Sequence, residues 1–153
     1  MKQKITSCLL GMGLLAAVGL AYGADRFSYS IDGSEVTDNT TGLIWRRCAE
    51  GMTWSGVACT DSASKYSHQA ALQRAQTQTG WRLPNVKELS SVVDRSFTNP
   101  AIDPTAFPNT PSGLFWTSSP YVGGSDNAWF VNFINGAGKY NSRDDLNYVR
   151  LVR

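Results

Sequence analysis

The feature that most constrains this chain is a punctuated stretch at residues 80–89 (GWRLPNVKEL). Gly80 suits the left-handed conformation in which many helices end, and Leu83, which precedes a proline, is pushed away from helical geometry. Asn85 is a good N-cap residue, and Glu88 stands three positions later, as in a capping box. The stretch therefore predicts one helix that ends just before Gly80 and a second that begins at Asn85, joined by a short extended bridge.

The first 23 residues have the pattern of a signal peptide. A start with two lysines precedes a mostly apolar run at residues 5–20, and residues 21–23 (AYG) offer a cleavage site. The apolar run is too short for a convincing membrane span, so an uncleaved anchor is the less favoured alternative. We therefore expect an exported protein, either periplasmic or at the cell surface or beyond it. Its single mature domain comprises residues 24–153, with no membrane segment after cleavage.

Removal of the signal peptide changes the charge balance and the cysteine count. The whole chain has 14 basic and 12 acidic residues, and the loss of Lys2 and Lys4 leaves 12 of each, a net charge of zero. A neutral domain argues against a nucleic-acid partner, for which a broad basic face is expected. Two cysteines remain, Cys48 and Cys59, and we expect them to form a disulfide in an oxidising compartment. The alternative is a free thiol pair or half of a metal site.

Short strands are predicted in both halves of the mature chain, with two helices between them. The strands are expected at residues 26–31, 36–38, 43–45, 114–118, 128–134 and 148–153, and the helices at residues 67–79 and 85–94. Ser64 or Ser67 is the expected cap of the first helix. Five prolines between residues 100 and 120 indicate a long, ordered and irregular loop. This pattern describes an α+β domain with small antiparallel sheets and long irregular loops.

Five segments of the mature domain carry a family resemblance. They are residues 36–45 (VTDNTTGLIW), 81–89 (WRLPNVKEL), 99–103 (NPAID), 115–119 (FWTSS) and 149–153 (VRLVR). In this order they resemble the bacterial Lcl C-terminal domain family, a domain of largely unknown function. The resemblance implies a C-type-lectin-like fold, in which two helices flank small antiparallel sheets and the terminal strands pair. The collagen-like adhesin that names the family binds sulfated glycosaminoglycans, so the resemblance also implies a lectin-like or adhesin-like binding module.

Two activities known from such folds find no motif in this chain. Calcium-dependent sugar-binding C-type lectins carry Glu-Pro-Asn or Gln-Pro-Asp together with Trp-Asn-Asp, and none of these tripeptides occurs here. The related formylglycine-generating enzymes depend on a late cysteine pair, and no cysteine follows Cys59. The carboxylates left as calcium candidates are those of Asp126, Asp144 and Asp145. We expect no cofactor and no assigned metal.

The titratable residues favour no known type of catalysis. His68 is the only histidine, and near the first turn of a helix it is expected to be solvated or to act as a cap. A hydrolytic triad or a typical zinc site is hard to build from one histidine. Asp144 and Asp145 are adjacent, so on a strand their side chains would point to opposite faces, unlike the paired carboxylates of glycosidases. The sequence therefore predicts a protein that is not an enzyme.

Aromatic and charged residues give the better candidates for binding. Three tryptophans lie inside apolar runs and are expected in the core: Trp81, Trp116 and Trp129. Four residues in predicted turns are the ligand candidates: Tyr121, Lys139, Tyr140 and Arg143. A tyrosine ring can stack on a sugar, and the two cations can meet a sulfate or carboxylate, with Arg143 offering bidentate geometry.

Two functions of different classes follow. The first is an exported binding module for an acidic or sulfated glycan or for a surface protein. The alternative is a structural subunit of a periplasmic or cell-surface assembly, whose loops make protein–protein contacts. A shared groove containing Lys139, Arg143 and either Arg46 or Arg47 favours the first, whereas an exposed apolar patch without such a groove favours the second.

Overall fold

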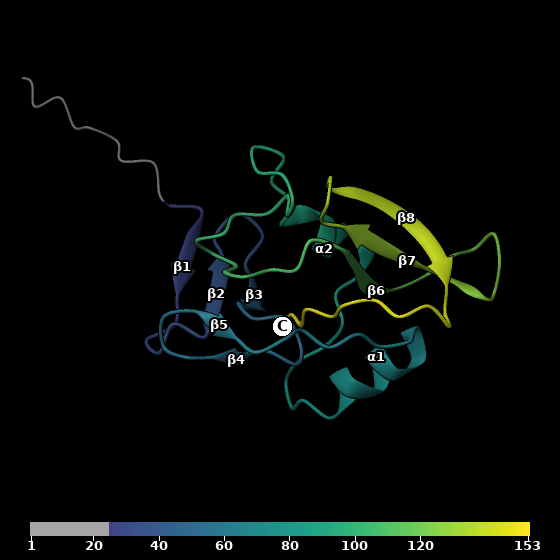
Figure 1. The fold of residues 1–153 in the computed structure, drawn as a ribbon, viewed down its shortest axis with the longest axis horizontal. Helices are drawn as coiled ribbons and strands as arrows, with labels where there is room; N and C mark the ends of the chain where they lie inside the picture. The colour runs from purple at the N-terminus through teal and green to yellow at the C-terminus, as the bar shows by residue number, and fades with distance from the viewer. Residues whose placement is uncertain (1–24) are drawn as a thin grey trace, which may run out of the picture.

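The computed structural model describes residues 25–153, which contain ten short elements (Figure 1). In chain order they are β1 (Phe27–Tyr29), β2 (Glu35–Asp38), β3 (Leu43–Arg46), β4 (Thr53–Trp54), β5 (Cys59–Thr60), α1 (His68–Gln76), α2 (Val86–Ser91), β6 (Leu114–Pro120), β7 (Asn127–Asn132) and β8 (Ala137–Ser142). The strands form three small antiparallel sheets, ordered β1-β2-β3, β4-β5 and β6-β7-β8. The predicted α+β class is confirmed. The predicted signal peptide lies outside the described residues, and within residues 25–153 no helix has the length and apolarity needed to cross a bilayer.

The β1-β2-β3 sheet follows the predicted hairpin. Val36 of β2 is the partner of Trp45 in β3, and both side chains are fully buried. The free edge of β3 pairs with the end of the chain, because Ile44 and Arg153 exchange two backbone hydrogen bonds of 2.9 Å. β1 lies at the opposite edge of this sheet. The expected pairing of the first and last strands is therefore wrong.

Residues 148–153 do not form the regular strand that their alternation predicts. They make isolated bridges to three separate segments: Val152 pairs with Trp45 of β3 and with Arg82 in the bridge between the helices, and Tyr148 pairs with Phe115 of β6. Figure 1 shows this segment running between the N-terminal sheet and the β6-β7-β8 sheet. Because its partners change every few residues, a continuous ladder with any one strand cannot form.

The stretch at residues 80–89 behaves largely as its residue types predict. The side chain of Asn85 accepts a hydrogen bond from the Glu88 backbone, and the Glu88 side chain accepts one from the Asn85 backbone. This capping box begins α2. The Glu88 carboxylate also accepts two hydrogen bonds of 2.7 Å, one from each terminal nitrogen of the Arg82 guanidinium. Gly80 has a φ of +77°. However, α1 ends at Gln76 rather than at residue 79, and α2 ends at Ser91 rather than at residue 94.

The first helix is capped by Ser67, whose hydroxyl accepts a hydrogen bond from the Ala70 backbone. The C-cap of the helix is Thr77, whose hydroxyl donates a hydrogen bond of 2.7 Å to the carbonyl of Arg74. The small residues Ala71 and Ala75 are buried on the inner face of α1. This face packs against β6, which accounts for the small side chains at these positions.

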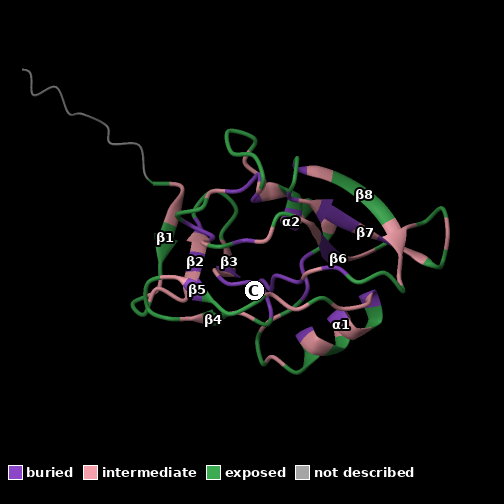
Figure 2. Cartoon of the chain, viewed as in Figure 1, coloured by how far each residue is buried: buried purple, intermediate pink, exposed green. Residues whose placement is uncertain are grey.

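The third sheet carries a strand that the sequence did not predict. β7 and β8 are joined by the turn at residues 135–136, as the Asn-Gly pair indicates, but β8 itself lacks an apolar pattern. Figure 2 shows β7 largely buried and the middle of β8 exposed. β8 therefore forms an open edge of the domain, and Lys139 and Tyr140 lie on this strand rather than in a turn.

Cys48 and Cys59 form the predicted disulfide, with a Cα–Cα distance of 5.4 Å. The enclosed segment is not a plain loop, because β4 and β5 form a small hairpin within it. Both cysteines are largely buried. The bond thus links the chain just after β3 to a short hairpin whose two strands pair over only two residues each.

Reduction of this disulfide is expected to lower the free energy of unfolding by about 3 kcal/mol. The reason is that the unfolded chain is then no longer closed into a loop by two cysteines with a sequence separation of 11. The measurement is urea unfolding of the protein with and without dithiothreitol. The double variant Cys48→Ala/Cys59→Ala serves as the control and should match the reduced protein. Equal stability of the oxidised and reduced forms would contradict the expected constraint.

Candidate functional site

Three aromatic side chains gather on the β6-β7-β8 sheet and form what we call the aromatic platform: Tyr121, Trp129 and Tyr140. The rings of Tyr121 and Tyr140 stack with centroids 3.8 Å apart and an interplanar angle of 13°. Trp129 meets both rings edge-on, at 5.8 Å and 6.2 Å. Trp129 and Tyr140 are cross-strand partners of β7 and β8, so the sheet register sets their contact. Tyr140 remains 50% exposed.

The end of the Tyr121 side chain also lies close to Gly123. A Cβ added at Gly123 would lie 2.5–2.7 Å from three atoms of the Tyr121 side chain, a distance that no real side chain tolerates. Tyr121 therefore stacks on Tyr140 and leaves no room for a side chain at Gly123. The three rings of the aromatic platform pack against one another, which lowers the entropic cost of binding.

A hollow of about 480 Å³ borders the aromatic platform and is lined by Trp129, Gly138, Lys139 and Tyr140. Lys139 makes no ion pair within residues 25–153. Its cross-strand partner is Phe130, whereas that of Tyr140 is Trp129, so the Lys139 side chain leaves β8 on the opposite face from the rings and only borders the hollow. Of the four predicted ligand residues, the fold brings two, Tyr121 and Tyr140, into the aromatic platform, and a third, Lys139, to the border of its hollow.

The fourth predicted residue, Arg143, lies in a neighbouring hollow of about 360 Å³ beside α1. Its Nε donates to the carbonyl of Ser125 at 2.9 Å, and its Nη1 lies 2.9 Å from Nδ1 of His68. Ser125 belongs to the loop that carries Tyr121. Arg143 thus anchors this loop and does not face the aromatic platform.

His68 is buried, with 1% of its surface exposed, so the expectation of a solvated or capping residue is wrong. Its Nε2 lies 2.9 Å from the carbonyl of Thr117, and its ring packs edge-on against Trp116. Burial lowers the pKa of His68, the carbonyl of Thr117 partly opposes this shift, and the charge of Arg143 adds to it. The neutral ring is the stable form. A histidine at the first position of a helix gives no sequence signal for such a partner on a distant strand.

Comparison with known families identifies the chain. A family model described as the Lcl C-terminal domain matches residues 34–153. The chain belongs to the Lcl C-terminal domain family. No curated protein sequence matches it.

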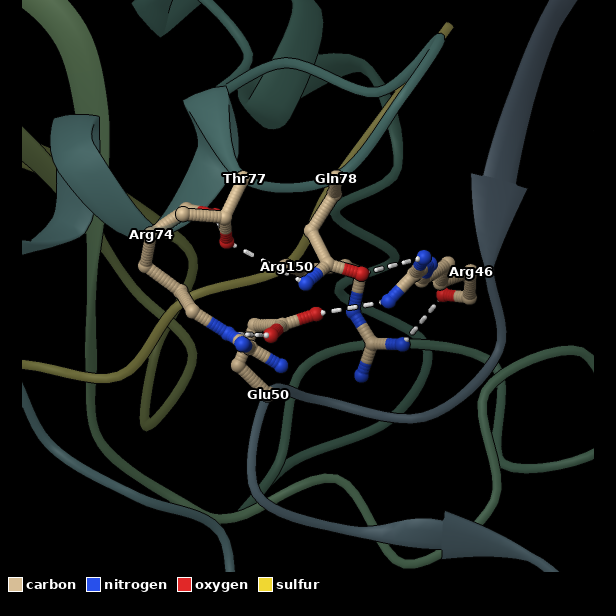
Figure 3. A network of polar contacts seen from close by, with 6 residues as sticks. All are labelled: Arg46, Glu50, Arg74, Thr77, Gln78 and Arg150. Atoms are coloured by element: carbon tan, nitrogen blue, oxygen red, sulfur yellow. Dashed lines mark hydrogen bonds and ion pairs between the residues drawn. The ribbon is translucent and has the colours of Figure 1, made fainter.

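In this Lcl C-terminal domain, the arginines Arg46 and Arg47 do not share a groove with Lys139. Arg47 is tied to three carbonyls, those of Gly33, Thr105 and Ala106. Figure 3 shows the other arginine in a polar network around Glu50, whose buried carboxylate accepts hydrogen bonds from Arg46 at 3.1 Å and from Arg74 at 2.7 Å. Arg46 also donates to Gln78 at 2.9 Å. Both arginines are thus committed to holding the domain together, and the expected groove of Lys139, Arg143 and Arg46 or Arg47 is not formed within residues 25–153.

Two of the three tryptophans expected in the core lie partly at the surface. Trp116 is fully buried, as predicted. Trp129 is half-buried because its ring packs against two surface tyrosines. Trp81 is also half-buried, and the guanidinium groups of Arg46 and Arg153 lie over its ring at 4.9 Å and 4.8 Å. Apolar neighbours in the sequence could not reveal these polar or exposed surroundings.

The calcium candidates are not assembled into a site in the described part of the chain. Asp126 and Asp144 line the hollow beside Arg143, whereas Asp145 does not. Within residues 25–153 no group of three or more His, Cys, Asp or Glu side chains is placed to hold a metal ion.

Proposed function

We propose that this Lcl C-terminal domain is an exported, non-catalytic binding module that recognises a glycan on the aromatic platform. The observation that carries the proposal is the stacked pair of Tyr121 and Tyr140 beside the half-buried Trp129. The C–H face of a sugar ring packs well on an aromatic plane, and the exposed ring of Tyr140 offers such a plane. The adjoining hollow provides a concave wall for the same ligand.

Charge narrows the class of glycan. Lys139 borders the hollow and makes no ion pair within residues 25–153, while Arg46, Arg47 and Arg143 are held by other residues of the domain. One cation suits a single carboxylate or sulfate group, because a densely sulfated chain needs several cations along one groove. We therefore propose a sugar that carries an isolated acidic group, such as a uronic acid or one sulfate ester.

The proposal includes a C-type-lectin-like arrangement of the chain and its export to the periplasm or the cell surface. The first is supported by two helices beside small antiparallel sheets and by the return of the chain end to β3. The second is supported by the signal-like residues 1–23 and by the disulfide between Cys48 and Cys59.

Truncation of Tyr140 to alanine is expected to weaken glycan binding roughly tenfold to a hundredfold, because the exposed stacking surface is lost. The measurement is a glycan array with the purified mature domain, followed by calorimetric titration with each glycan that binds. Tyr29→Ala is the matched control, since Tyr29 is 44% exposed but lies on the β1-β2-β3 sheet. It should leave the affinity unchanged.

Added salt and Lys139→Ala test the role of charge in the same experiment. Both should weaken binding of acidic sugars while leaving neutral analogues less affected. The proposed site would be refuted if no acidic sugar on the array bound the domain, or if Tyr140→Ala and Tyr29→Ala lost equal glycan affinity. Binding that requires calcium would instead point to a site at Asp126 and Asp144.

A second candidate function is a protein–protein contact at the tips of two hairpins. Ile31 and Val57 are strongly exposed there. The two hairpins touch, because the indole Nε1 of Trp54 donates to the carbonyl of Asp32 at 2.8 Å. The double variant Ile31→Asp/Val57→Asp should abolish cross-linking to a partner on intact cells if this contact is the main function, and should leave glycan binding intact.

A further inference from the structure

The side chain of Arg143 joins α1 to the loop that supports the aromatic platform. Arg143 follows β8 directly, and its guanidinium lies between Nδ1 of His68 and the carbonyl of Ser125, each at 2.9 Å. The backbone reinforces this junction: the amide of His68 donates to the carbonyl of Arg143, and the amide of Arg143 donates to the carbonyl of Asp126. Residues 121–126 are therefore fastened to the rest of the domain through Arg143.

The contact requires a neutral imidazole. Nε2 of His68 faces a carbonyl oxygen, which only accepts, so this nitrogen carries the proton. Nδ1 then has a free lone pair and accepts the hydrogen bond from Arg143. Protonation would add a second N–H to the ring, at Nδ1. This N–H would point at the guanidinium of Arg143, which has only donors. Two cations with opposed donors cannot remain 2.9 Å apart at this partly buried contact.

The surrounding charges favour separation of the two cations after protonation. Arg143, Asp126 and Asp144 are the charged groups that line the hollow, while Ser67, Gln69 and Leu72 from α1 line it without charge. β6 presents only uncharged groups to the imidazole, namely Trp116 and Thr117. The two carboxylates offer Arg143 an alternative partner close by. A displaced Arg143 would leave the carbonyl of Ser125 without its donor.

We propose that protonation of His68 releases Arg143 from the loop at residues 121–126 and thereby weakens ligand binding on the aromatic platform. The predicted loss of ligand binding rests on the proposed function, whereas the predicted release of Arg143 does not. Tyr121 connects the two, because its ring depends on the position of Gly123 in the same loop.

The direction of the pH effect follows from the neutral state of His68. Burial lowers the pKa of His68 below its ordinary value of 6.5, and the nearby guanidinium lowers it further. The contact is therefore complete above pH 6.5 and is lost as the pH falls through the lower pKa of the folded protein. The same step removes stability on acidification, because the unfolded chain takes up the proton more readily.

The experiment is an NMR titration of the free, tag-free mature protein from pH 7.5 to pH 4. His68 is the only histidine in the chain, so its imidazole resonances need no mutational assignment. We expect the imidazole to titrate below pH 6.5, and the Arg143 Nε–H and the amides of residues 124–127 to shift with the same midpoint. In His68→Gln, which cannot titrate, these shifts should vanish while the carboxylate transitions remain. An imidazole that is still neutral at pH 4, or one that titrates while the loop amides stay still, overturns the inference.

Binding of the glycan at the same pH values completes the test. The affinity of the wild type should fall with the midpoint seen by NMR, and that of His68→Gln should not change over this step. A wild-type affinity that stays constant while the loop amides shift overturns the regulatory step. If no glycan binds at any pH, the proposed function fails, whereas the NMR titration still decides the behaviour of the His68–Arg143 contact.

Discussion

Substitution of Gly51 by alanine is expected to lower the free energy of unfolding by about 3–5 kcal/mol. Gly51 has a φ of +91°, which residues with a side chain rarely adopt. An added Cβ would lie 2.5 Å from the backbone nitrogen of Ser64 and would also collide with its side chain. The Ser64 nitrogen cannot retreat freely, because it donates to the carbonyl of Glu50 at 2.8 Å. Urea unfolding followed by tryptophan fluorescence measures the loss.

Gly56 provides a matched control within the same disulfide-closed segment. Its φ is +96°, close to that of Gly51, but nothing lies within 4 Å of an added Cβ. Gly56→Ala should therefore show only the conformational cost, about 1–2 kcal/mol. The difference between the two variants isolates the steric contribution of Ser64. Equal losses in both variants would show that the close approach to Ser64 contributes nothing.

Replacement of Arg150 by leucine is expected to be comparably damaging, with a loss of about 3–5 kcal/mol. Arg150 is fully buried, although within residues 25–153 no carboxylate pairs with it. Its Nη1 donates to the carbonyls of Arg46 and Arg47, and its Nη2 donates to the hydroxyl of Thr110 at 2.7 Å. Leucine would leave both carbonyls at the end of β3 without a donor. Burial lowers the pKa of Arg150 to about 9, so the side chain still carries its charge at neutral pH.

Two further variants separate the contributions of Arg150. Thr110→Val removes the acceptor of Arg150 Nη2, together with the hydrogen bond that this hydroxyl donates to the carbonyl of Phe107 at 2.8 Å, and should cost about 1–2 kcal/mol. Arg150→Lys keeps the charge but cannot reproduce the forked donors, so its stability should lie between those of the wild type and Arg150→Leu. Chemical unfolding of all three variants at pH 7 tests this order. A stable Arg150→Leu protein would mean that the desolvation cost of the guanidinium cancels the value of its hydrogen bonds.

The elements that the sequence predicted well are those specified by local chemistry. Asn85 and Glu88 form a capping box because both partners lie within four residues of each other. Ser67 caps α1 for the same reason, and the Asn-Gly pair at residues 135–136 turns the chain between β7 and β8. In each case the residues that determine the structure are close neighbours in the chain.

The elements that the sequence missed depend on distant partners. Residues 148–153 alternate like a half-exposed strand, yet Arg150 points into the core because the carbonyls that it satisfies lie 103 and 104 positions earlier. His68 is likewise buried through contacts with Thr117 and Arg143. No local pattern encodes such pairings.

The candidate site was predictable in part for the same reason. Tyr121 and Tyr140 are ligand candidates in the sequence because they are aromatic residues in predicted turns, and their role stays a prediction. Their stacking and the participation of Trp129 follow from the register of β7 and β8, which a sequence without an apolar pattern in β8 does not reveal. The position of Arg143 behind the loop also depends on α1, which lies far away in the chain.

The path of residues 148–153 also bears on how the domain folds. Leu151 and Val152 are buried in the two different core clusters, and Arg153 completes the edge of β3. The early hairpin of β2 and β3 therefore gains its last neighbour only when a segment about one hundred residues later arrives. Contacts of such separation are entropically costly to close and are associated with slow folding. The domain should consequently fold slowly and in one cooperative step, since both core clusters stay incomplete until this segment is in place.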